Sequence, residues 1–179
     1  MSRARFELVW EGDKFEAKAR QAVAVGTTAT AAALANVIAN NFGTEGGGVV
    51  GADASPLAGG PTTNRKRLRK RARYIAAPPG AFPGVRSSNL RNSIAFSRAT
   101  PENLQAAAGT NLARSPDLDS NGRPVTAEDV DRYALYLEFG TSKMPARPFL
   151  LRSLRENTAM LHRIFINTTA KEMARGKAK

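Results

Sequence analysis

The stretch that most constrains the fold of this chain is residues 133–151, YALYLEFGTSKMPARPFLL. Aromatic and leucine side chains recur at helical spacing in its first part, which predicts a short helix with one apolar face. Gly140 follows, and glycine is the residue that best tolerates a left-handed helix stop. Pro145 and Pro148 then hold the chain extended, and a second helical apolar pattern begins at Leu150. Two helices joined in this way should form a rigid corner.

A helix is therefore expected on each side of the corner. Thr126, with Asp129 three residues later, predicts a capping box for the helix that enters it. A C-terminal helix of about 24 residues, roughly 36 Å long, should leave it from Leu150. Its apolar stripe is predicted to contain Leu150, Leu154, Thr158, Leu161, Ile164, Phe165 and Thr168.

A long helix is also expected near the N-terminus. Asp13 can cap it, and the apolar pattern continues to about Asn41. Alanine and glycine, including Gly26, dominate its stripe at 3.6-residue spacing. Small side chains on this face would let another backbone approach closely.

Strands are expected in three places, with a fourth candidate in the corner. Arg5–Trp10 alternates between apolar and charged side chains, which is typical of a half-buried strand. Ser93–Arg98 and Leu104–Thr110 should form an antiparallel pair, and Met144–Phe149 is the fourth candidate. The predicted fold class is α+β, with the N-terminal and C-terminal helices packed on a small, mainly antiparallel sheet. Its strand edges would invite a partner subunit.

We expect one domain, residues 1–179, because this length suits a single core. A flexible insertion is predicted at about 44–84, where glycine, proline and alanine abound without periodicity, and a basic tail at 172–179. Cysteine is absent, which excludes disulfides and thiol catalysis. The N-terminus lacks a signal-peptide core, and no run of about 18 apolar residues occurs, so no membrane partner is expected.

The net charge of +12 is concentrated in one segment. Residues 54–101 hold ten basic residues and no acidic one, while the remainder is close to neutral. Seven of the ten form a cluster, which we call the basic run: Arg65, Lys66, Arg67, Arg69, Lys70, Arg71 and Arg73. This run could contact phosphates of duplex DNA or dock on an acidic protein surface. Few aromatic side chains lie near it, so sequence-specific reading of nucleic acid is not expected.

Catalytic chemistry has little basis in this sequence. His162 is the only histidine, and it falls within the predicted C-terminal helix with no serine–acid constellation beside it. We therefore expect no enzyme activity and no cofactor. Residues 117–128 match the pattern of a calcium-binding loop, but no helix is predicted to enter them. The candidate ligands are Asp117, Asp119, Asn121 and Glu128, and the alternative is a polar turn leading into a helix cap.

Glu138 is a carboxylate in an otherwise apolar helix face. One interpretation places it at the rim of the core, capped by Thr141 or Ser142. The other gives it an ion pair between subunits, with Arg147 or a neighbour's arginine. Both remain open at the level of sequence. The residues expected at the corner or at a subunit interface are Tyr136, Glu138, Phe139, Gly140, Thr141, Met144, Arg147, Pro148 and Phe149.

The motif YLEFGTSKMPARPFL resembles the core signature of small head–tail joining, or tail-completion (neck, minor tail), proteins of long-tailed bacteriophages. Residues 78–94, PPGAFPGVRSSNLRNSI, resemble the second landmark of that family, a proline- and glycine-rich approach to a leucine–serine–isoleucine element. The two stretches cover about a fifth of the chain, in the family's order and rough spacing.

The resemblance implies a structural virion protein at the head–tail junction or tail end, assembled in the host cytoplasm. Its partners would be copies of itself in a ring around the DNA path, sixfold by the family's setting, and neighbouring connector and tail proteins. Duplex DNA would be a further partner through the basic run. The alternative is a small nucleic-acid-binding protein without sequence specificity, for which the charge is the argument.

Overall fold

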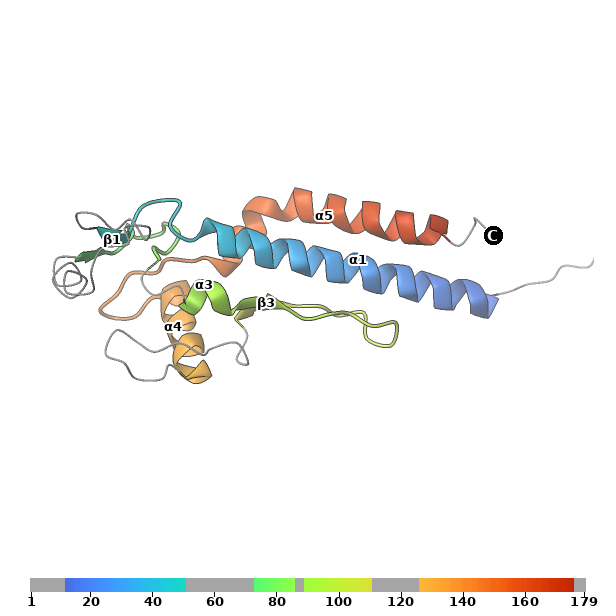
Figure 1. The fold of residues 1–179 in the computed structure, drawn as a ribbon, viewed down its shortest axis with the longest axis horizontal. Coiled ribbons are helices and arrows are strands. Elements are labelled where there is room, and N and C mark those ends of the chain that lie inside the picture. The colour runs from blue at the N-terminus through green and yellow to red at the C-terminus, as the bar shows by residue number, and fades with distance from the viewer. Residues whose placement is uncertain (1–11, 51–72, 86–88, 111–125, 176–179) are drawn as a thin grey trace, which may run out of the picture.

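A computed structural model describes residues 12–50, 73–85, 89–110 and 126–175 of the chain (Figure 1). The elements in chain order are α1 (Gly12–Asn41), β1 (Gly48–Val50), β2 (Arg73–Ile75), α3 (Asn89–Ser93), β3 (Ile94–Phe96), β4 (Ala108–Thr110), α4 (Ala127–Phe139) and α5 (Leu150–Arg175). Long N-terminal and C-terminal helices with short antiparallel strand pairs confirm the predicted α+β class. The predicted strand Arg5–Trp10 lies outside the described residues.

The helices α1 and α5 lie side by side and run in opposite directions (Figure 1). Small residues of α1 make this possible: Ala22 and Gly26 of the predicted stripe are buried, and so is Ala24, which the prediction did not include. A Cβ added at Gly26 would collide with Thr169 Oγ1 and lie 3.3 Å from Phe165 Cδ2. Glycine therefore allows the two helix backbones to approach closely at this point.

The predicted apolar stripe of α5 is only partly correct. Leu161 is buried, but Leu154 is 42% exposed and Thr158 is also exposed. Ser153 is fully buried instead, and its hydroxyl oxygen accepts a hydrogen bond from Asn41 Nδ2 at 3.0 Å. Ser153 therefore faces the end of α1, and Leu154, the next residue on α5, faces outward. The helix continues to Arg175, so the first residues of the predicted tail at 172–179 are helical.

Within the described residues the strands form two separate pairs, not the single three- or four-stranded sheet that the sequence suggested. β3 and β4 pair antiparallel, with Ala95 opposite Gly109, which confirms the predicted hairpin although its ladder is shorter than expected. The prediction of a strand over Met144–Phe149 is wrong. Only an isolated bridge joins Thr141 to Met144, and the prolines that follow have no amide to donate to a ladder.

A second strand pair lies inside the predicted insertion at 44–84. β1 and β2 are antiparallel, with Gly48 opposite Ile75 and Val50 opposite Arg73. The sequence prediction missed this pair because β1 follows a glycine run, although its valines and the Tyr–Ile of β2 favour strands. Residues 51–72, which connect the two strands and hold six of the seven cations of the basic run, lie outside the described residues.

The core sits where the end of α1 meets α3, β3, α4 and the start of α5. Phe149 is completely buried, and its ring centroid lies 5.2 Å from that of Phe42. The other buried members are Ala35, Ile38, Phe82, Leu90, Ile94, Val130, Ala134 and Leu137. Both sequence landmarks contribute to this cluster, through Phe82, Leu90 and Ile94 in one and Leu137 and Phe149 in the other.

Among the described helices, α1 alone has the length and apolar composition of a membrane span. A core helix rich in alanine has the same composition. Here the small residues of α1 pack against α5 and the β3–β4 hairpin.

Candidate functional site

The corner between α4 and α5 is held by the carboxylate of Glu138. Its Oε2 accepts hydrogen bonds from the amides of Phe149 at 2.8 Å and Leu150 at 3.0 Å, and its Oε1 accepts one from Leu151 at 3.0 Å. The first amides of a helix lack partners within the helix and form its positive end, where a carboxylate is favourable. Glu138 is therefore the cap of α5.

This contact differs from the predicted cap by Thr141 or Ser142, since the Glu138 carboxylate accepts from amides of α5. None of the described ion pairs within the subunit involves Arg147, and an ion pair of Glu138 with an arginine of a neighbouring subunit stays a prediction. The side chain is only 9% exposed, because the start of α5 sits directly on it. A glutamate eleven residues before the first of these amides gives no local capping pattern, so sequence could not identify this contact.

Gly140 ends α4 with φ 75° and ψ 179°. The positive φ agrees with the prediction, but the extended ψ does not belong to the left-handed helical region that we expected. This is a region that only glycine adopts readily. A Cβ at this position would lie 2.8 Å from the Ala146 amide nitrogen and 2.9 Å from the Met144 carbonyl oxygen. The chain reverses immediately afterwards, with Thr141 and Met144 exchanging hydrogen bonds at 2.8 and 3.2 Å.

Arg147 is a buried cation whose described partners are carbonyl oxygens. Its side-chain Nε donates to the Ala77 carbonyl at 2.7 Å, and its Nη1 donates to the Pro145 carbonyl at 3.4 Å. Its backbone amide donates to the Leu137 carbonyl at 2.7 Å, which satisfies an acceptor near the end of α4. Arg147 thus joins the corner to the segment that follows β2.

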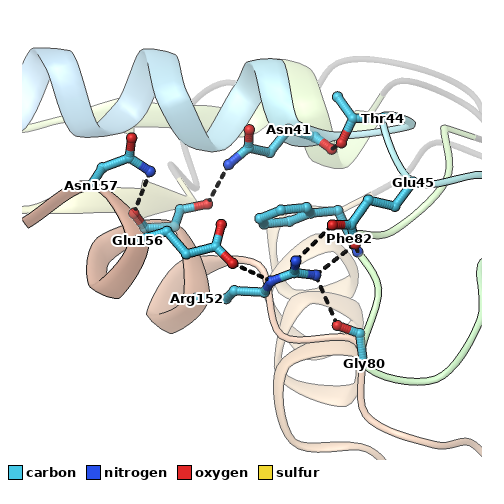
Figure 2. A network of polar contacts seen from close by, with 9 residues as sticks. Asn41, Thr44, Glu45, Gly80, Phe82, Arg152, Glu156 and Asn157 are labelled. Atoms are coloured by element: carbon cyan, nitrogen blue, oxygen red, sulfur yellow. Dashed lines mark hydrogen bonds and ion pairs between the residues drawn. The ribbon is translucent and has the colours of Figure 1, made fainter.

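Arg152 makes a second connection, which the sequence prediction missed. The guanidinium binds Glu45 with two contacts of 2.6 Å, and its Nη1 also donates to the Gly80 carbonyl at 3.0 Å (Figure 2). Its Nε donates to Glu156 at 2.7 Å. The same group lies 4.2 Å from the centroid of the Phe82 ring. Figure 2 shows these groups converging from the turn after α1, the 78–84 segment and α5.

The electrostatics of this contact favour the ionised pair. The hydrogen bonds from Arg152, and then the one from the Phe82 amide at 2.9 Å, hold the pKa of the Glu45 carboxyl below its ordinary value. The hydrogen bonds to Glu45 and Glu156 raise the pKa of Arg152 further. Bidentate arginine–carboxylate contacts fix orientation as well as distance. The pair therefore sets the position of the turn after α1 against α5.

These contacts anchor the β1–β2 pair to the corner. Gly80 donates its amide to the Ala146 carbonyl at 2.9 Å, and Gly43 donates to the Pro83 carbonyl at 2.9 Å. The chain leaves the described structure at residue 50 and re-enters at residue 73, from adjacent, paired strands. Of the basic run, only Arg73 belongs to a described element.

An apolar groove of about 570 Å³ lies beside the corner. It is formed between α1, β4, α4 and α5, and its lining includes Leu34, Ile38, Leu135, Phe139, Leu151 and Leu154. Phe139 is 75% exposed and Leu135 is 57% exposed. Tyr136, another residue predicted at an interface, is also exposed, whereas Phe149 is buried in the core. Of the residues predicted at the interface or corner, Tyr136 and Phe139 therefore lie on the surface, whereas Phe149 belongs to the core.

The remaining chemical candidates are dispersed. His162 is exposed on α5, and Glu128 is exposed in the first turn of α4. The other calcium candidates, Asp117, Asp119 and Asn121, lie outside the described residues. The capping box of α4 is confirmed, since Thr126 Oγ1 accepts from the Asp129 amide and Asp129 accepts from the Thr126 amide. The hydrogen bonds from Thr126 hold the pKa of Asp129 below its usual range.

Comparisons with models of protein families, with curated proteins and with solved structures give no match to this chain.

Proposed function

We propose that this protein is a structural subunit of a phage particle that joins the tail to the head-side connector, assembled as a ring around the DNA path. The observation that carries the proposal is the exposed apolar surface around the groove. Leu135, Phe139, Leu151 and Leu154 stand together on two helices, and monomeric proteins rarely leave such a patch uncovered. A surface of this kind suits assembly better than catalysis.

The corner supports the proposal by explaining the motif on which the resemblance rests. Glu138, Gly140, Arg147 and Phe149 all belong to that motif, and each fixes the angle or position of α5 relative to α4. Both helices contribute side chains to the apolar surface. A fixed corner therefore presents that surface in one geometry, which is what a repeated contact between identical subunits requires.

The basic run supports a contact with polyanions. Its flanking strands are paired and tied to the corner through the contacts of Arg147 and Arg152. We expect the cations to neutralise phosphates of DNA passing through the ring. The second candidate function, a small nucleic-acid-binding protein, rests on the same run and on the net charge of +12. It differs in requiring no assembly.

Light scattering over a range of protein concentrations, with and without duplex DNA, separates the two functions. The structural proposal predicts association in the absence of DNA and its loss in Phe139→Ser, which removes the most exposed apolar side chain of the groove. Ile166→Ser is the control, because Ile166 is 50% exposed on the far part of α5. A protein that stays monomeric until DNA is added, and binds it in either variant, would support the nucleic-acid-binding function instead.

A further inference from the structure

We draw no further inference here: the strongest candidate, the second apolar groove, of about 500 Å³, between the alanine-rich face of α1 and the stretch from Phe96 to Pro101, is an unpartnered face, and nothing in the structure shows what covers it.

Discussion

At the scale of single residues, Gly140 is the position where the corner tolerates least change. Its φ of 75° and the 2.8 Å approach of the Ala146 nitrogen to a built Cβ act together. Gly140→Ala should lower the free energy of unfolding by at least about 2 kcal/mol, because strain and a collision with backbone add. Urea denaturation measures the change.

Substitutions at two other glycines distinguish backbone strain from the collision with the Ala146 backbone. Gly80→Ala adds a side chain at φ 76° with nothing within 4 Å, so it reports strain without collision. Gly109→Ala has neither a positive φ nor a close neighbour and should stay within about 0.5 kcal/mol of the unmodified chain. The expected order of destabilisation is Gly140, then Gly80, then Gly109. Equal effects at Gly140 and Gly80 would show that the collision with Ala146 is unimportant.

Glu138 holds the same corner by charge and hydrogen bonding. Glu138→Gln keeps the shape of the side chain but leaves one acceptor oxygen for three amides. It should lower the free energy of unfolding by about 1–2 kcal/mol, as the loss of a helix cap does. Glu128→Gln is the control, since Glu128 is exposed in the first turn of α4. Equal stability of the two variants in urea would mean that the start of α5 does not depend on the carboxylate.

At the scale of elements, the Glu45–Arg152 contact makes the packing of α5 sensitive to acid. Hydrogen bonds from Arg152 lower the pKa of Glu45 in the folded protein from an ordinary value of 4.5. The stabilisation from the ionised Glu45 is therefore complete above about pH 4.5 and is lost as the pH falls through the lowered pKa of this carboxyl. Glu45→Gln should flatten this acid-side loss in urea midpoints measured against pH. Glu16→Gln, in an exposed pair with Arg20, should leave the profile unchanged.

The elements also show what sequence can and cannot predict. Periodicity predicted α1, α4 and α5 closely, and the Thr126–Asp129 capping box was correct, because these signals lie within a few residues of one another. The cap of α5 by Glu138 and the bond from Arg147 to Ala77 join distant segments, so no local pattern encodes them. The rotation of α5 was mispredicted for the same reason, since Ser153 faces inward to meet Asn41.

At the scale of the whole molecule, the charge of the basic run can be changed without touching the described core. Replacing Arg67, Arg69, Lys70 and Arg71 with alanine should weaken duplex DNA binding and flatten its salt dependence. For every phosphate that the variant no longer neutralises, the slope of log affinity against log salt should decrease in magnitude by about 0.9. Thermal stability should stay within about 0.5 kcal/mol, as is usual for surface changes.

A second variant, which removes the same number of positive charges from another part of the chain, controls for the effect of net charge alone. Replacing Arg155, Arg163, Lys171 and Arg175 with alanine removes four exposed cations from α5. If both variants lose affinity equally, DNA responds to the total charge and the basic run has no special role. If the first variant binds DNA unchanged but fails to join heads to tails, the run is a dock for an acidic protein. Unfolding of that variant would instead place the run within the packing of the subunit. Loss of affinity confined to the first variant is the result expected of a run that neutralises phosphates along a DNA path.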